Sequence, residues 1–252
     1  IDDFTGVVIH SDMEHTGSFE CSNPLINRLQ DNILWSQRGN FLDVPTDCPQ
    51  RDERLGWTGD AQVFIRTACF NMNVASFFAK WLKDLKADQL DNGGVPHVIP
   101  HVLGDDAHSS AAWADAALIC PWTIYLCYGD KRILEEQYDS MKAWVEYIRR
   151  QGENEYLWNT GFHFGDWLGL DAKEGSYVGS TAKDYIATAF YAYSTSLLVK
   201  TAEVLGKIDD VEEYTKLYNN IIHAFRKEFV TPNGRLAVPT QTAHVLALMF
   251  DL

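Results

Sequence analysis

The fold is decided by residues 111–148, which read AAWADAALICPWTIYLCYGDKRILEEQYDSMKAWVEYI. The first part predicts an Ala-rich apolar helix that continues to Tyr128 and ends at Gly129-Asp130. From Lys131 onward, apolar residues recur at helical spacing and predict a second helix with one buried face. Because the turn between them is so short, the two helices are expected to form an antiparallel hairpin.

Apolar residues at helical spacing also occur on both sides of this hairpin. Asn23-Pro24 supplies an N-cap and a proline in the first turn of a helix. Further helices are expected before residue 65, over 74–85, 185–205 and 211–225, and from about residue 242, whereas the first twenty residues read as one or two short strands. About eight helices in hairpins suit a solenoid or a closed α/α toroid. The lack of a regular sequence repeat favours the toroid.

Composition and charge restrict the function. The 252 residues are 46% apolar, include eight Trp, and carry a net charge of −14. This charge argues against nucleic acid and against an anionic membrane surface as partners, but not against a neutral carbohydrate. No apolar run reaches the length of a membrane span. The five cysteines form no CxxC pair and are expected to be mostly buried thiols. The chain starts at Ile1 and both ends look cut, which leaves the cellular compartment open.

The loop over residues 44–60, VPTDCPQRDERLGWTGD, concentrates carboxylates and guanidinium groups around one indole. A glycosidase needs a carboxylic acid that stays protonated until it reaches the leaving oxygen, and burial beside an indole or another carboxylate raises the pKa of such a group. Ionised carboxylates bind sugar hydroxyls, and Trp offers a flat apolar face to a pyranose ring. The alternative is a solvated loop with internal Arg–Asp pairs, which the Pro and Gly spacing and the adjacent apolar helix disfavour.

The run from Asp47 to Asp60 closely resembles the signature of bacterial α-L-rhamnosidases, whose catalytic domain is an (α/α)6 barrel. The resemblance covers residues 23–252 and continues through four shorter motifs, Gly93-Gly-Val-Pro96, Ala112-Trp113-Ala-Asp115, Phe164-Gly-Asp166-Trp167 and Thr240-Gln-Thr-Ala243. It implies an all-α fold over 23–252 that is the N-terminal part of an (α/α)6 toroid, incomplete with about eight of twelve helices. Residues 1–22 would be a short β segment or linker from a preceding domain.

The resemblance also implies roles for individual residues. Glu53 becomes the general acid. The other implied site residues bind the substrate, as carboxylates that hold sugar hydroxyls or as indole walls that suit the methyl group of a 6-deoxy sugar: Asp47, Trp57, Asp60, Trp113, Asp166 and Trp167. Arg51 and Arg54 are expected to hold the carboxylates in place. No cofactor is implied.

An inverting glycosidase needs a second carboxylate as general base, with room for a water molecule between the two groups. In the family this base lies beyond the region that corresponds to Leu252, and Glu153, Glu155 and Glu174 lack its sequence context. We therefore expect the chain alone to be catalytically weak or inactive. An open two-thirds barrel is also expected to expose apolar helix faces, which favours pairing with another chain, including a homo-oligomer.

The leading hypothesis is an inverting α-L-rhamnosidase that releases terminal α-L-rhamnose from plant glycosides or polysaccharides. The alternatives are an exo-glycosidase of the same barrel with another sugar preference, and a carbohydrate-binding fragment without turnover. A metal site is disfavoured, because the histidines and aspartates between His97 and His108 fit no zinc spacing and are expected to line the pocket rim. Three indoles at helical spacing, Trp81, Trp122 and Trp144, are expected in the core, while Trp35 and Trp158 are left undecided.

Overall fold

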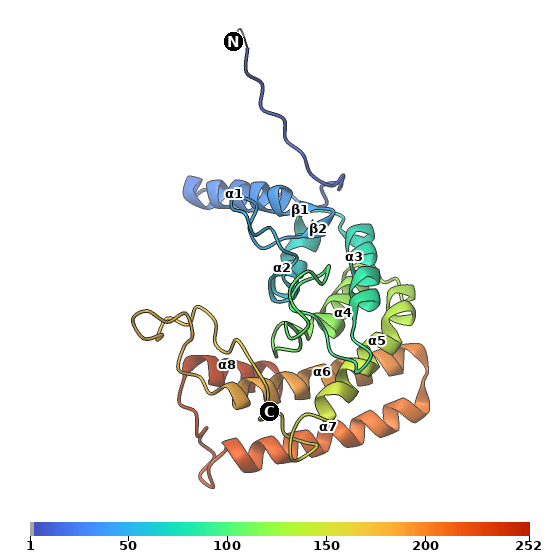
Figure 1. The fold of residues 1–252 in the computed structure, drawn as a ribbon. Coiled ribbons are helices and arrows are strands. Elements are labelled where there is room, and N and C mark those ends of the chain that lie inside the picture. Colours follow the sequence, from blue (N-terminus) through green and yellow to red (C-terminus); the bar gives the residue numbers. More distant parts are fainter. Residues whose placement is uncertain (1–2) are drawn as a thin grey trace.

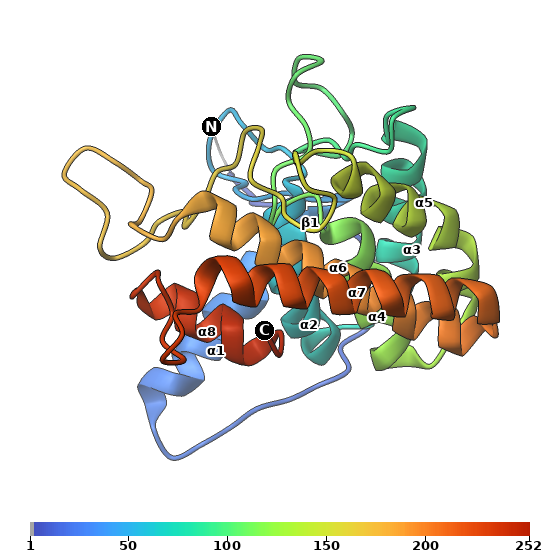
Figure 2. The ribbon, with the colours of Figure 1, turned by 90° about the horizontal axis from the view of Figure 1, so that it is seen from below.

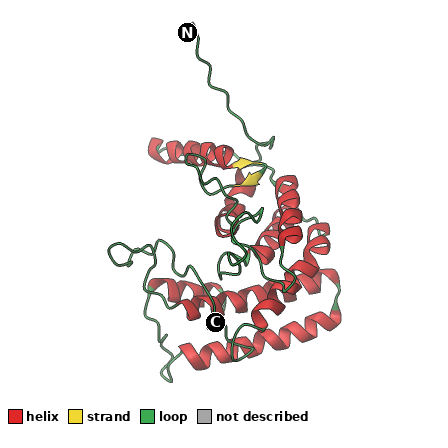
Figure 3. Ribbon diagram, in the orientation of Figure 1, coloured by secondary structure: helices red, strands yellow, loops and turns green. Residues whose placement is uncertain are grey.

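Eight helices form an open arc in the computed structural model, which describes residues 3–252 (Figure 1). The helices are α1 (Pro24–Asn40), α2 (Thr58–Asn71), α3 (Ala75–Asp88), α4 (Ala116–Tyr128), α5 (Arg132–Arg149), α6 (Lys183–Leu205), α7 (Ile208–Phe229) and α8 (Gln241–Met249). The predicted all-α architecture and the number of helices are confirmed within the described residues. Loops coloured green in Figure 3 connect the helices, and Figure 2 shows the long ones over 89–115 and 150–182 on the same side of the molecule as the loop over 46–57.

Among residues 3–252, regular strand pairing is confined to a short hairpin after α1. Strands β1 (Phe41–Leu42) and β2 (Val44–Pro45) pair antiparallel, with Phe41 opposite Pro45. The first of the described residues extend away from the helices (Figure 1). Residues 11–16 lie against the helical part, where the Ser11 N–H donates to the Phe41 carbonyl and His15 forms an isolated bridge with Met72. That residues 1–22 belong to a preceding domain stays a prediction.

Several helix boundaries follow the signals in the sequence, whereas the Ala-rich helix begins at Ala116 and not at Ala111, because residues 111–115 form turns. The side chain of Asn23 accepts a hydrogen bond from the backbone N–H of Leu25 at 3.0 Å, so it caps α1 as expected. Gly129 ends α4 with φ of 71°, and Gly206 ends α6 with φ of 68°. These turns produce the predicted α4–α5 hairpin and a second hairpin in which α6 and α7 lie side by side (Figures 1 and 2).

The core holds half of the eight tryptophans. Trp81, Trp144 and Trp158 are fully buried, and Trp122 is half-buried against the same cluster, whereas Trp35 is exposed. All five cysteines are free and three of them are buried, as expected for structural thiols. Within the described part of the chain, no helix combines the length and the apolar character that a membrane crossing requires.

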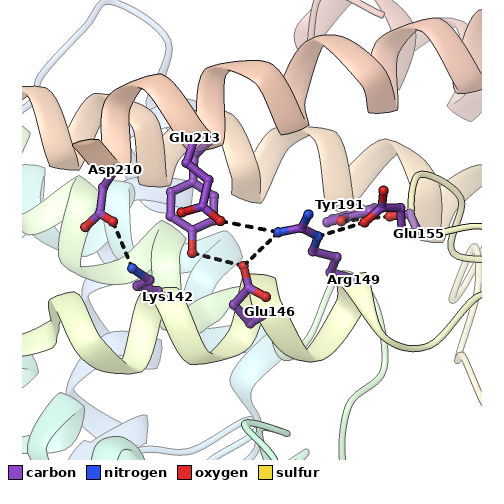
Figure 4. Close-up of polar contacts among 8 residues, drawn as sticks. Lys142, Glu146, Arg149, Glu155, Tyr191, Asp210 and Glu213 are labelled. Atoms are coloured by element: carbon purple, nitrogen blue, oxygen red, sulfur yellow. Dashed lines mark hydrogen bonds and ion pairs between the residues drawn. The ribbon is translucent and has the colours of Figure 1, made fainter. Parts of the chain in front are cut away.

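Ion pairs fasten α5 to α7 and to the following loop (Figure 4). Arg149 contacts Glu146 at 3.5 Å, Glu155 at 3.0 Å and Glu213 at 3.4 Å, and Lys142 contacts Asp210 at 2.8 Å. Because Arg149 is only 30% exposed and has three carboxylate partners, this network is screened less than an isolated surface pair. The carboxylate of Glu155 is therefore engaged in an ion pair with Arg149.

Apolar side chains are exposed on three helices at the open side of the arc. They come from α1, α2 and α8 and include Leu25, Leu29, Val63, Leu248 and Met249. Exposed apolar helix faces are what an open barrel predicts. That another chain covers them stays a prediction.

A buried carboxylate joins three helices near the centre of the molecule. Asp115, which directly precedes α4, is fully buried. Its Oδ1 accepts hydrogen bonds from Trp144 Nε1 of α5 at 3.0 Å and from Ser194 Oγ of α6 at 2.6 Å, and its Oδ2 accepts one from the Ala112 N–H at 2.8 Å. Burial raises the pKa of Asp115 to about 6, even though the three hydrogen bonds favour the charged form.

Asp115 is expected to make stability depend on pH. An unfolded Asp has a pKa of about 4, so between there and about pH 6 the folded state binds a proton that the unfolded state has released. The unfolding free energy therefore falls as pH rises through this window, by at most about 3 kcal/mol. Asp115→Asn lacks this titration. In urea denaturation, the stability advantage of the wild type over the variant should shrink from about pH 4 to about pH 7; an advantage that stays constant or grows contradicts the assignment.

Candidate active site

A cavity of about 630 Å³ is lined by α1, α2, α6 and α8 and by three loops. This volume is typical of small-molecule sites, which span roughly 300–1,000 Å³. Five of the seven predicted site residues line the cavity: Asp47, Asp60, Trp113, Asp166 and Trp167. The structure therefore brings together side chains that are up to 120 positions apart in the sequence.

Glu53 and Trp57, the two remaining predicted residues, lie beside the cavity and not on its wall. The indole Nε1 of Trp57 donates a hydrogen bond to Glu53 Oε1 at 2.7 Å, which fixes the carboxylate against the start of α2. The side chains of Asp47, Cys48 and Glu53 approach one another, with their ligand atoms within 4.8 Å. The loop thus delivers the predicted acid next to a predicted sugar-binding carboxylate.

Arg51 neutralises part of the negative charge of Asp47 and Glu53. Its Nη2 lies 2.7 Å from Glu53 Oε2 and 3.4 Å from Asp47 Oδ2, and its Nε donates to Cys48 Sγ at 3.0 Å. Arg51 therefore holds the carboxylates, as the sequence suggested. Arg54 does not: its Nε donates to the Pro49 carbonyl at 3.2 Å, so it braces the backbone of the loop.

Asp47 and Asp60 approach the cavity from adjacent elements. The Asp47 side chain is only 12% exposed, and its Oδ1 is buried without a hydrogen-bond partner. Asp60 lies in the first turn of α2 and opens into the cavity. The surrounding cavity walls nevertheless remove water from its carboxyl and raise its pKa, and the charges of Asp47 and Glu53 raise it further. A ligand that donates hydroxyl hydrogen bonds would relieve this crowding of negative charge.

Phe164 connects the indoles of the site, a role that the sequence analysis missed. Its ring centroid lies 4.6 Å from that of Trp113, 5.8 Å from that of Trp57 and 5.8 Å from that of Trp167. His97 packs against the same ring at 4.9 Å. The sequence did contain a signal for this residue, because Phe164 opens one of the motifs that carry the resemblance. A single Phe, however, gives no indication that it has three aromatic neighbours.

The Trp113 indole packs directly against Gly59 of α2, where there is no room for a side chain. A Cβ on Gly59 would come within 2.6 Å of the Trp113 indole nitrogen, so a glycine is required for this contact. The preceding residue, Ala112, has φ of 66°, which is unfavourable for a residue with a side chain. Its N–H is bound by Asp115 and its carbonyl accepts a hydrogen bond from Gln62 Nε2 of α2.

Asp166 is anchored to α8 through two threonines. Its Oδ2 accepts a hydrogen bond from Thr181 Oγ1 at 2.7 Å, and Thr181 Oγ1 lies 2.8 Å from Thr240 Oγ1. Thr240 in turn caps α8 by accepting from the Ala243 N–H at 3.2 Å. This chain of contacts explains why two distant motifs belong to one site, since the loop that carries Asp166 and Trp167 is fixed to the start of α8.

The histidines near the site have structural environments. Burial, together with the charges of neighbouring histidines, lowers the pKa of His97 to about 4. His163 Nδ1 accepts from the Ala111 N–H at 3.1 Å and Nε2 lies 3.1 Å from the Thr160 carbonyl, so its ring is held neutral between two backbone groups. Among residues 3–252, the one group of three clustered potential metal ligands is Asp47, Cys48 and Glu53, where Arg51 already supplies positive charge.

Comparison with known proteins matches this arrangement to one family. Residues 14–252 match the family model described as the bacterial alpha-L-rhamnosidase 6 hairpin glycosidase domain. A curated alpha-L-rhamnosidase of Formosa agariphila is 47% identical over 98% of this chain, which covers 26% of that protein. An alpha-L-rhamnosidase of Streptomyces avermitilis is 41% identical over 98% of this chain and 23% of its own length. The chain thus spans about a quarter of these relatives.

Solved structures show the same fold. The crystal structure of an Aspergillus terreus α-L-rhamnosidase superposes with a TM-score of 0.91 at 44% identity, over 96% of this chain and 28% of that one. The Streptomyces avermitilis α-L-rhamnosidase, solved in complex with L-rhamnose, superposes with a TM-score of 0.88 at 40% identity, over 96% of this chain and 22% of that one. These matches agree with the helical hairpins and the cavity described above. The chain therefore belongs to the bacterial α-L-rhamnosidase family and forms part of the six-hairpin glycosidase domain.

Proposed function

We propose that the protein releases terminal α-L-rhamnosyl groups from glycosides or polysaccharides by single displacement with inversion. The observation that carries the proposal is the cavity in which Asp47, Asp60 and Asp166 face two indoles, with Glu53 held at its edge by Trp57. Carboxylates beside aromatic faces suit a neutral sugar that has both hydroxyl groups and a methyl group. Relatives named alpha-L-rhamnosidase at 41–47% identity support this substrate class.

Glu53 is the proposed general acid. Its carboxyl would donate a proton to the glycosidic oxygen as the bond to the anomeric carbon breaks. Trp57 donates a hydrogen bond to this carboxylate and Arg51 forms an ion pair with it, so Arg51 must give up its contact before Glu53 can carry a proton. Arg51 can do so readily, because its side chain is 59% exposed and Asp47 offers it another partner.

The general base is proposed to lie outside this chain. Of the carboxylates on the cavity wall, Asp47 lies within the same cluster as Glu53, which leaves no room there for a water molecule on the opposite face of the sugar. Asp60 belongs to the same group of charges, since Asp47 and Glu53 raise its pKa, and Asp166 is held by Thr181. We therefore propose that the 252-residue chain binds L-rhamnose but turns over a nitrophenyl α-L-rhamnoside weakly or not at all. Turnover by this chain equal to that of the full-length protein contradicts a missing base.

Glu53→Gln in the full-length protein tests the acid. Loss of general acid catalysis is expected to reduce kcat by about 10²–10⁴-fold for a methyl α-L-rhamnoside. The loss should be smaller for a nitrophenyl α-L-rhamnoside, because nitrophenolate leaves without a proton. Affinity for L-rhamnose should be retained, since the amide still accepts the Trp57 hydrogen bond.

Asp52→Asn is the matched control, because Asp52 is an exposed neighbour in the same loop. It should leave both rates unchanged. Equal losses with the two leaving groups would contradict general acid catalysis by Glu53. A carbohydrate-binding protein without turnover would instead show no hydrolysis by the wild type and unchanged affinity in Glu53→Gln. Detection of α-L-rhamnose as the first product by NMR would contradict inversion, which yields the β anomer.

Gly59→Ala tests the indole wall. A methyl group at this position would push the Trp113 indole away, because the new Cβ would lie 2.6 Å from its nitrogen. We expect weaker L-rhamnose binding by calorimetry, on the order of tenfold, as even small misplacements of contact groups are costly. Gly104→Ala is the control, because nothing lies within 4 Å of a Cβ there. Unchanged affinity in Gly59→Ala would contradict a role for this wall in sugar binding.

A further inference from the structure

We propose that Asp115 is a positioning residue, which sets the affinity of the cavity for sugar by holding the backbone of Ala112, directly before Trp113, in a strained conformation. Asp115 does not line the cavity and acts through Trp113, which does. The inference rests on the proposed function, because it assigns this cavity to a sugar. It adds a residue from the buried centre of the molecule to those that determine binding.

The contacts of Asp115 leave no freedom for its carboxylate. Oδ2 accepts from the Ala112 N–H at 2.8 Å, and Oδ1 accepts from Trp144 Nε1 at 3.0 Å. Both donors are N–H groups, which cannot reverse their role. An Asn at this position must therefore turn its NH₂ toward one of two N–H donors, whichever way the amide is oriented. Full burial prevents water from replacing the lost bond.

Ala112 needs this support because of its backbone. With φ of 66° it occupies the left-handed region, which disfavours residues that have a Cβ. Two side chains restrain it from opposite directions, Asp115 at the N–H and Gln62 at the carbonyl. Gln62 belongs to α2, is buried and lines the cavity, and its one side-chain hydrogen bond goes to this carbonyl, since its Oε1 has no partner. Two restraints on one strained residue indicate that its conformation matters.

The residue that benefits is Trp113. Its indole follows Ala112 directly, rests on Gly59 and packs against Phe164 with a centroid distance of 4.6 Å. If Ala112 relaxed to an ordinary φ, the direction of the chain into Trp113 would change and the indole would leave this position. The other oxygen of Asp115 accepts from Trp144 of α5 and Ser194 of α6, so the helices and Ala112 are held by different oxygens.

Asp115→Asn in the full-length protein tests the inference. We expect the dissociation constant for L-rhamnose and the KM for a nitrophenyl α-L-rhamnoside to rise by about tenfold or more, with a smaller change in kcat, because the indole binds sugar and transfers no proton. Ser194→Ala is the matched control: it removes one hydrogen bond from Oδ1 and leaves the Ala112 bond intact. It should lower the Tm but leave the dissociation constant unchanged.

Ala112→Gly separates positioning from a general loss of structure. Gly adopts a positive φ without strain, so in the Asp115→Asn background it should recover part of the lost affinity. If Asp115→Asn fails to fold, Gln62→Met releases Ala112 from its carbonyl side and should weaken binding. Because Gln62 also lines the cavity, Ala112→Gly should recover part of the affinity in this background as well, which loss of a direct Gln62 contact with the sugar would not allow.

Three outcomes would overturn the inference: unchanged affinity in folded Asp115→Asn, an equal loss of affinity in Ser194→Ala, or no recovery with Ala112→Gly. If Asp115→Asn does not fold, unchanged affinity in Gln62→Met would overturn it. Absence of L-rhamnose binding by the wild type would instead contradict the proposed function, so the two failures are distinguishable.

Discussion

The buried carboxylate of Asp115 is the interaction on which both the packing and the cavity depend. One oxygen binds Trp144 of α5 and Ser194 of α6, and the other binds the peptide before Trp113. A fully buried carboxyl is costly unless each oxygen has hydrogen-bond donors, and here three donors are supplied by three separate segments. The helices cannot shift relative to one another without leaving this group unsatisfied. The wall of the cavity is thereby tied to the centre of the hairpin stack.

The other parts of the site are fixed in different ways. The acidic loop is held by Arg51, which neutralises Asp47 and Glu53 from the solvent side, while Trp57 binds Glu53 from the start of α2. Phe164 fills the space between the three indoles. The result is a rigid aromatic wall facing a carboxylate group that can change its partners. This division suits a site that binds a neutral sugar and then moves a proton.

Much of this arrangement could be predicted from the sequence. The helical hairpins follow from apolar spacing and from Gly129 and Gly206, which are local signals, and the cap at Asn23 is local as well. The placement of Asp47, Asp60, Trp113, Asp166 and Trp167 around one cavity agrees with the roles implied by the resemblance. Their roles in catalysis and binding stay proposals.

The contacts between these elements could not be predicted from the sequence. Nothing in the sequence indicates that Gln62 binds the carbonyl of Ala112, that Ala112 has a positive φ, or that Phe164 touches three indoles. The partner of Arg54 could not be predicted either. Its charge suggested a carboxylate, whereas in the fold it binds the backbone carbonyl of Pro49. Such contacts depend on the packing of segments far apart in the chain, and they decide how a motif becomes a site.

The most direct test of the account is a crystal structure of the full-length protein with L-rhamnose bound. The account predicts that the sugar occupies the cavity between α2 and α6, with hydroxyl groups on Asp47 and Asp60, an apolar face on Trp113, and Glu53 released from Arg51. L-Rhamnose bound outside this cavity, or bound within it without contact to Trp113 and to either carboxylate, would contradict the account.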